Sequence, residues 1–459
     1  MKKQALLALM LALTLILSGC TLIQKDPAVD AATVIIKLGD AEVTKGEIQE
    51  QVNEQLRYMA QVYSMYGYSY DPTSPENIAS AQESVIDSFK KKLVSDAKIA
   101  ELGLDKLTEE EEAQVQSKAE ETYQSNLDYT KDDEEYADLS DEEKTEKAKA
   151  KLEETGYTME KALENARETV LSDKLRQEII KDVAVTEEDI QKEYDSRVES
   201  AKSTYENDAA AWTTAANNGT TLYYTPAGVR FVKQILTKFT DEDQAAIDAA
   251  KAKVTETGAK VTEAESKVSD AQAILDDENA SEEDKSAAKG DLEAAQADLT
   301  AAQADADAAR AEEQTATETA FANIDAVADD VLKQLEEGAD WDTLMAEKNQ
   351  DPGMQSGITA ERGYAVTSTM TSFDSAFVEA AMALEKPGDH SGKVRGNSYG
   401  YYIIKYVEDA VEGAINQEEV KSEIESSVLS TKQDETYENT IHEWVDAADF
   451  KIDLNALKD

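Results

Sequence analysis

A long stretch in which small and apolar residues recur at steps of three and four constrains this chain most. The pattern fills two arms, at residues 247–275 and 288–309. A polar segment at residues 276–284 separates them, and Ser281 within it is suited to cap the second arm. Two heptad arms joined by a short turn predict an antiparallel coiled-coil hairpin over residues 240–320.

Alanine occupies many of the core positions of this predicted hairpin. Alanine lets two helix backbones approach closely, but it buries little apolar area per layer, so we expect modest stability. Two interpretations stay open. The hairpin is either a spacer without activity of its own, or the working part of a structural or adhesive surface protein.

The first twenty residues have the order of a secretory leader. Lys2 and Lys3 precede an apolar run at residues 5–17, which is too short to span a bilayer comfortably. The run ends in Leu17-Ser18-Gly19-Cys20, which resembles a bacterial lipobox. The alternative, an ordinary buried helix with a stray cysteine, does not account for this order of charged, apolar and small residues.

The leader therefore predicts a signal peptide over residues 1–19, a lipid on Cys20 and a tether over residues 20–33. Two or more acyl chains on one residue meet the requirement for stable anchoring. Cys20 is the only cysteine, so no intramolecular disulfide can form. We expect a protein anchored to the outer face of the bacterial cytoplasmic membrane.

The acidic composition excludes one class of partner. The chain carries 97 acidic and 46 basic residues, a formal charge of −51, and no basic stripe, so we expect no binding to nucleic acid. Solubility explains the charge more simply than an acidic binding role. The only histidines are His390 and His442, which excludes a histidine-rich metal site; no metal or cofactor is predicted.

The N-terminal half reads as helical. Residues 34–43 alternate like a strand, a turn and a strand, and Thr44 and Glu47 then form a capping box that opens a helix. Tyrosine and methionine crowd residues 58–70. Residues 132–151 have too few large apolar side chains for a core, so we expect a solvated helix or a mobile connector there.

The C-terminal half mixes strands and helices. A strand is predicted at residues 229–239, and helices are predicted at residues 327–338, 341–348 and 373–384. A hairpin follows at residue 394 and residues 401–407. A long helix at residues 417–445 and a short strand at residues 450–454 end the prediction.

Five short motifs in this half, together with residues 35–104, resemble the extracytoplasmic parvulin-type foldases, the PrsA lipoproteins and their periplasmic relative SurA. The motifs are Val229–Leu236, Glu337–Trp341, Asp351–Gly353, Phe377–Gly388 and Tyr399–Lys405. Roughly half of the chain is covered, and the acidic connector and the hairpin lie outside the resemblance.

The resemblance implies a predominantly helical α+β fold. A helical SurA-N-like chaperone segment would span residues 34–208, with a C-terminal helix and strand at residues 409–459 packing back on it. A parvulin-like domain would be inserted at residues 226–408, itself interrupted by the hairpin at residues 240–320.

The resemblance also implies a site for X-Pro peptide bonds. Rotation about such a bond crosses a barrier of about 20 kcal/mol, and a catalyst needs an apolar cradle and polar groups that favour the twisted imide. By resemblance, Phe373, Phe377 and Met382 match the proline-ring pocket of the family. Equally, all three can be ordinary core residues on one helix.

The polar half of the predicted site departs from the family. Members with isomerase activity usually carry a histidine in the first and last strands, where this chain has Gln234 and Tyr402. Asp351 matches the acidic position of the family. His390 and His442 lie elsewhere in the sequence and do not replace the missing histidines. The implied peptidyl-prolyl isomerase activity is therefore uncertain, whereas the implied fold is not affected.

We interpret the chain as a membrane-anchored foldase whose partners are unfolded, newly exported polypeptides and their X-Pro segments; a homo-oligomer is compatible with this. One alternative is a holdase with an inactive parvulin domain. Another is the structural or adhesive lipoprotein described above. A solute-binding lipoprotein is disfavoured because strands and helices do not alternate as its paired lobes require.

Overall fold

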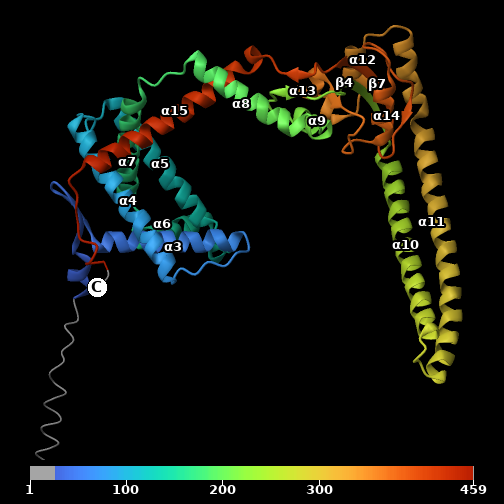
Figure 1. Ribbon diagram of the computed structural model, residues 1–459, viewed down its shortest axis with the longest axis horizontal. Coiled ribbons are helices and arrows are strands. Elements are labelled where there is room, and N and C mark those ends of the chain that lie inside the picture. Colours follow the sequence, from blue (N-terminus) through green and yellow to red (C-terminus); the bar gives the residue numbers. More distant parts are fainter. Residues whose placement is uncertain (1–25, 458–459) are drawn as a thin grey trace, which may run out of the picture. The chain divides into compact units, whose positions relative to one another are not determined.

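The protein is described by a computed structural model that covers residues 26–457 (Figure 1). Helices predominate, and short antiparallel sheets accompany them, so the predicted helical α+β class is confirmed. The chain divides into two compact units. Unit 1 comprises Met1–Val185 and Ser426–Asp459, and unit 2 comprises Thr186–Glu425. The predicted signal peptide and Cys20 lie outside the described residues.

Unit 1 consists of helices around a small three-stranded sheet with the order β2-β1-β9. Its elements are α2 (Pro27–Ala31), β1 (Val34–Leu38), β2 (Ala41–Thr44), α3 (Lys45–Met65), α4 (Pro75–Glu101), α5 (Glu109–Lys131), a 3-10 turn (Glu134–Tyr136), α6 (Asp141–Glu154), α7 (Met159–Ile180), the later part of α15 (Gln417–Ala447) and β9 (Lys451–Ile452).

The predicted capping box begins α3. The backbone N–H of Thr44 donates to the Glu47 carboxylate at 2.8 Å, and the backbone N–H of Glu47 donates to the Thr44 hydroxyl at 3.4 Å. One face of α3 then packs on the β1–β2 hairpin and on α4, in a core formed by Ile35, Ile36, Val43, Ile48, Val52, Leu56, Ala81 and Val85. The predicted strand, turn, strand and helix are all confirmed.

Two segments of unit 1 are more ordered than the sequence indicated. Residues 27–31, expected to belong to a tether, form a helix that Asp26 caps, and Asp30 forms a 2.7 Å ion pair with the buried Lys45. In the charged connector, α6 packs on α5 through Leu127, Ala148 and Leu152. The connector is therefore helical, as one of the two expectations had it, but the expectation that it contributes no core is wrong, because Tyr136 and Ala148 are buried.

The two ends of the chain meet in unit 1. The terminal helix α15 places Ile441 and Val445 against Val94, Ile99 and Leu175 of α4 and α7. The strand β9 pairs antiparallel with β1, with Ile452 opposite Ile36. Residues more than 300 positions apart in the sequence therefore share one core.

Unit 2 is organised around a four-stranded antiparallel sheet with the order β5-β4-β7-β6. Its elements are α8 (Glu187–Tyr205), α9 (Ala209–Asn217), β3 (Tyr224–Thr225), β4 (Arg230–Lys238), α10 (Asp241–Asp276), α11 (Glu282–Glu336), α12 (Trp341–Lys348), a 3-10 turn (Pro352–Met354), α13 (Ile358–Arg362), β5 (Tyr364–Val366), α14 (Ser375–Ala383), β6 (Val394–Arg395), β7 (Gly400–Asp409), β8 (Gly413–Ala414) and the start of α15.

The central strands of this sheet bury both faces. On one face, Leu236, Tyr402 and Ile404 pack on α14. On the other face, Ile235 and Ile403 pack on α12 and the last turns of α11. This alternation follows from the period of two along a strand, and it separates the surroundings of Tyr402 from those of its neighbour Tyr401.

The predicted hairpin is present as two long helices, α10 and α11, which lie side by side along their length (Figure 1). Thr240 and Ser281 cap them as N-cap residues. One boundary differs from the prediction. Residues 327–338 were expected to form a separate helix, but α11 runs unbroken to Glu336, because neither proline nor glycine interrupts the periodic pattern there.

Candidate functional site

A pocket of about 180 Å³ opens in unit 2 between β4, β7 and the segment that leads into α14. It brings together most of the residues that the sequence singled out. Its lining residues are Gln234, Leu236, Asp351, Tyr364, Ser372, Phe373, Asp374, Phe377, Tyr399 and Tyr402.

The register of β4 and β7 brings Gln234 and Tyr402 to the pocket. In the β4–β7 pair, Gln234 lies opposite Ile404 and Leu236 lies opposite Tyr402. Gln234 and Tyr402 therefore project from the same face of the sheet and are diagonal neighbours, two positions apart along the strands. Both are buried, with 6% and 5% of their surface exposed.

Asp351 organises one side of the pocket. Its Oδ2 accepts hydrogen bonds from Gln234 Nε2 at 2.6 Å and from the Tyr364 hydroxyl at 2.9 Å. Its Oδ1 accepts from the backbone N–H of Gly353 at 3.1 Å. A side chain at Gly353 would collide with the Tyr364 hydroxyl, since an added Cβ would lie 1.8 Å from it. The Asp351-Pro352-Gly353 motif thus allows this close approach.

Asp374 organises the other side. It caps α14 by accepting from the backbone N–H of Ala376, and it accepts from the backbone and side-chain amides of Asn397 at 2.6 and 2.8 Å. The negative charge of Asp374 also acts on the Tyr402 hydroxyl, which lines the same pocket. A Cβ at Gly396 would lie 2.5 Å from the Tyr402 ring, so glycine is required where this turn passes the tyrosine.

Both buried tyrosines of the pocket stay protonated. Burial, followed by the negative charge of Asp374, raises the pKa of Tyr402 far above its usual value. Burial and the charge of Asp351 do the same to the pKa of Tyr364. Neither phenol can therefore act as an acid or base near neutral pH.

Aromatic rings form the apolar wall. Neighbouring rings lie in contact from Tyr364 to Phe373 (5.0 Å between centroids), from Phe373 to Phe377 (5.8 Å) and from Phe377 to Tyr402 (5.4 Å). Phe373 precedes α14 instead of lying on it, because the helix begins only after its N-cap at Asp374.

The three apolar residues singled out by the sequence separate in the structure. Phe373 is half-buried and lines the pocket. Phe377 lines it as well but is only 2% exposed, so it also serves as a core residue. Met382 packs against the same core without lining the pocket. Phe373 and Phe377 therefore line a pocket, Phe377 and Met382 contribute to a core, and the assignment of the pocket to a proline ring stays a prediction.

Sequence reasoning missed Tyr364 and Asp374. Both carried a signal: Tyr364 begins a short apolar segment after Gly363, and Asp374 stands where an N-cap would precede the predicted helix. His390 and His442, as expected, do not line the pocket, and both are exposed.

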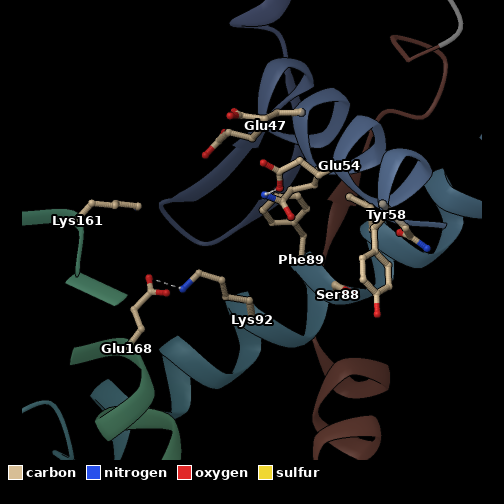
Figure 2. A pocket seen from close by; sticks show the side chains of 12 residues that line it. Glu47, Glu54, Tyr58, Ser88, Phe89, Lys92, Lys161 and Glu168 are labelled. Carbon is tan, nitrogen blue, oxygen red and sulfur yellow. Dashed lines mark hydrogen bonds and ion pairs between the residues drawn. The ribbon is translucent and has the colours of Figure 1, made fainter. Parts of the chain in front are cut away.

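A second, wider pocket of about 700 Å³ lies in unit 1 between α3, α4 and α7 (Figure 2). Acidic side chains of α3, including Glu47 and Glu54, face Lys92 and Lys161 across it, and Lys92 forms a 3.0 Å ion pair with Glu168. This pocket is charged and water-accessible, and it holds no arrangement that resembles a catalytic site.

Exposed apolar side chains crowd the C-terminal end of α3 and the loop after it. We call this set the tyrosine cluster; its members are Tyr58, Tyr63, Met65, Tyr66 and Tyr68, which are 38–73% exposed. Tyr63 contacts the rings of Tyr68 and Tyr70 at centroid distances of 6.5 and 5.2 Å. Tyr58 also lines the wide pocket (Figure 2). Large apolar patches of this kind mark interaction surfaces.

Two searches of the described residues found nothing further. No helix between residues 26 and 457 combines the length and apolarity needed to cross a membrane. Within the same range, no group of three or more histidine, cysteine or acidic side chains is arranged to hold a metal ion.

Comparison with curated proteins identifies foldases as relatives. The chain is 30% identical over 189 residues to the foldase protein PrsA of Clostridium acetobutylicum, covering 39% of this chain and 49% of the relative. It is 28% identical over 180 residues to PrsA of Clostridium perfringens, covering 39% and 46%. The chain thus spans about half the length of the curated relatives it matches. The predicted resemblance to PrsA-type foldases is confirmed over this part.

Other comparisons add little to this relationship. No family model matches the chain. Among solved structures, the foldase protein PrsA of Streptococcus pneumoniae is 14% identical, with 93% of this chain and 97% of that chain covered and a TM-score of 0.24. A superposition this loose carries no information about the arrangement of domains.

Proposed function

We propose that the protein is a lipid-anchored, extracytoplasmic folding factor that holds unfolded segments of newly exported polypeptides, and that its parvulin-like domain binds X-Pro segments with little or no isomerase activity. The observation that carries this proposal is the pocket of unit 2. It combines the aromatic wall expected of a proline site with a Gln234 amide and a Tyr364 hydroxyl that already donate to Asp351.

Binding without efficient catalysis follows from that commitment. Acceleration requires contacts that are stronger in the twisted imide than in the planar one. The amide of Gln234 and the hydroxyl of Tyr364 are hydrogen-bonded to the Asp351 carboxylate instead, and the Tyr402 phenol, whose pKa is raised by burial and by the charge of Asp374, is no proton donor near neutral pH. Each tenfold of rate needs about 1.4 kcal/mol of preference for the twisted state, so a weak residual activity is compatible with this site.

A surface that binds an unfolded client must also be apolar and exposed to solvent. The tyrosine cluster of unit 1 offers such surface, and it is independent of the pocket chemistry in unit 2. Rigid aromatic side chains supply large contact areas at a small cost in conformational entropy. Unfolded chains expose the apolar segments that such a surface would bind.

Refolding assays separate the two activities. We expect the protein to suppress aggregation of an unfolded client whether or not that client contains proline. We expect little acceleration of a refolding step that proline isomerisation limits. Phe373→Ala should weaken binding of X-Pro peptides while the protein stays folded, because Phe373 is only half-buried.

The opposite pattern would contradict the proposal. Strong acceleration of proline-limited refolding that survives both Gln234→Ala and Tyr402→Phe would identify an active isomerase with substituted polar groups. Absence of any effect on client aggregation would instead favour the structural or adhesive lipoprotein.

A further inference from the structure

The polar atoms that line the pocket of unit 2 are unevenly divided between donors and acceptors. Two of its donors, Gln234 Nε2 and the Tyr364 hydroxyl, already donate to Asp351. The other side-chain donors among the lining residues are the neutral hydroxyls of Tyr402, Ser372 and Tyr399. The pocket therefore offers a ligand two carboxylates as acceptors but no charged donor.

One buried acceptor of the pocket has no partner. Gln234 is only 6% exposed, and its Oε1 meets no hydrogen-bond donor within the described residues. The amide orientation is fixed, because Asp351 accepts from Nε2 at 2.6 Å and a carboxylate cannot donate in return. A buried acceptor without a donor is unfavourable, so a ligand that brings an N–H group would relieve this imbalance.

The charges of the pocket have one sign. Among its ten lining residues the charged ones are Asp351 and Asp374, and no lysine or arginine is present. Asp374 already accepts three hydrogen bonds, one from Ala376 and two from Asn397. Asp351 has spare capacity, since its Oδ1 accepts only the long bond from Gly353. The free acceptors, Asp351 Oδ1 and Gln234 Oε1, therefore belong to neighbouring side chains.

The walls of the pocket suit a cation as well. Tyr364, Phe373, Phe377 and Tyr402 form a continuous aromatic surface. The face of an aromatic ring attracts a lysine or arginine side chain, most strongly where water is partly excluded. Aromatic rings beside a carboxylate favour cationic ligands, whereas a carboxylate or phosphate would meet like charge and no lysine or arginine.

On these grounds we propose that the pocket selects X-Pro segments in which lysine or arginine adjoins the proline, with Asp351 and Gln234 accepting from the cationic group. This specificity rests on the proposed function, because it names the class of segment that the same pocket binds. The strong negative charge of the whole chain would bring basic segments to the protein but would not favour a particular position within them.

Peptide titrations with the full-length chain test this. Four peptides share the sequence around one proline and carry lysine, acetyl-lysine, norleucine or glutamate before it. At low ionic strength we expect the lysine peptide to bind about five- to tenfold more tightly than the acetyl-lysine or norleucine peptides, and the glutamate peptide to bind most weakly. The advantage should shrink as salt is added.

Two controls separate the pocket from the general field. A fifth peptide of the same charge carries its lysine five residues from the proline, and it should bind no better than the norleucine peptide. On the protein side, Asp351→Asn should reduce the lysine advantage towards one, whereas Glu379→Gln should keep it. Glu379 is an exposed carboxylate on α14 that does not line the pocket.

The outcomes are distinguishable even if Asp351→Asn fails to fold, because the peptide comparison uses the unaltered chain. Equal affinity for the lysine, acetyl-lysine and norleucine peptides would overturn the cation preference and leave the proposed function intact. Equal benefit from the distant lysine would also overturn it. Failure of every peptide to bind would overturn the pocket as a client site, and with it the part of the proposed function that assigns X-Pro binding to the parvulin-like domain.

Discussion

Tyr364 and Tyr402 retain their phenolic protons in the folded protein because burial and a neighbouring carboxylate both oppose ionisation. In the unfolded chain a tyrosine has a pKa near 10. Because the pKa of each tyrosine is higher in the folded than in the unfolded protein, the contribution of the two phenols to the free energy of unfolding is complete below about pH 10. It is lost as the pH rises above that value. The pocket of unit 2 should therefore be a site of alkaline sensitivity.

We expect Tyr402→Phe to lose less stability than the original protein between pH 9 and pH 11, because the phenol that burial and the charge of Asp374 hold in its protonated form is absent. Urea unfolding across this range measures the difference. Tyr129→Phe is the matched control, since the Tyr129 side chain is 83% exposed. Identical pH slopes in all three proteins would contradict the assignment.

Arg230 stabilises the C-terminal end of α14, the helix that carries Phe377 of the pocket wall. Its Nη1 donates to the carbonyl oxygens of Ala381, Met382 and Leu384 at 2.9–3.2 Å, and its guanidinium lies 4.1 Å from the ring centroid of Tyr406. A cation at the C-terminal end of the helix also interacts favourably with the negative end of the helix dipole. The segment that begins with Phe377 is thereby fixed against the sheet.

Arg230→Met should destabilise unit 2 by about 2–4 kcal/mol, because the terminal carbonyl groups lose a charged donor in a buried place. Arg230→Lys should cost less, since one charged donor remains. In a Trp444→Phe background, only Trp212 and Trp341 remain, so tryptophan fluorescence follows unit 2 alone during denaturant unfolding. Arg310→Met on the exposed surface of α11 is the control, and an equal effect there would refute the role of Arg230.

At the scale of elements, the α10–α11 hairpin has two parts with different roles. Near the sheet, Phe321 and Ile324 of α11 pack with Phe239, Ile247 and Tyr401. Lys393 adds ion pairs of 2.6 and 2.5 Å to Asp325 and Asp329. The base of the hairpin therefore belongs to the core of unit 2.

Beyond this base the hairpin buries almost only small side chains. The buried residues are alanines and Thr257, namely Ala264 and Ala271 of α10 and Ala288, Ala295, Ala306 and Ala309 of α11, besides Thr257 itself. Such layers contribute little hydrophobic free energy. The distal part can therefore be removed without consequence for the core.

Deletion of residues 254–311, with the two helices rejoined by a short glycine-rich turn, should leave the unfolding midpoint of unit 2 nearly unchanged. Loop closure costs vary only slowly with length. Deletion of residues 241–319 removes Ile247 as well and should destabilise the unit by about 1–4 kcal/mol. Loss of cooperative unfolding in the shorter deletion would show that the distal hairpin is part of the core.

At the scale of the whole molecule, the sequence predicts a lipid on Cys20, which lies outside the described residues. Cys20→Ala should abolish lipid attachment and leave the protein either unprocessed or released into the medium. Membrane fractionation and mass spectrometry of the N-terminus measure this. Ser18→Ala keeps a small residue in the motif and should stay anchored. Correct processing and detergent-resistant membrane association of Cys20→Ala would exclude the lipobox.

Much of the architecture was predictable because it depends on local chemistry. The helix starts at α3 and α11 were predictable because their N-cap residues, Thr44 and Ser281, bond to groups only three residues away. The heptad pattern predicted the hairpin for the same reason. The unbroken course of α11 was missed, since nothing local distinguishes a helix that continues from two helices that abut.

The pocket was only partly predictable. The sequence by itself determined that Gln234 and Tyr402 occupy strand positions where histidines were expected, and that they alternate with apolar neighbours. Only the tertiary structure decided that the Gln234 amide donates to Asp351, 117 positions away along the chain, and that Tyr402 is buried near the charge of Asp374, 28 positions away. Strand alternation is a local property of the backbone. The choice of hydrogen-bond partner is made by packing between distant segments, and no pattern along one segment encodes it.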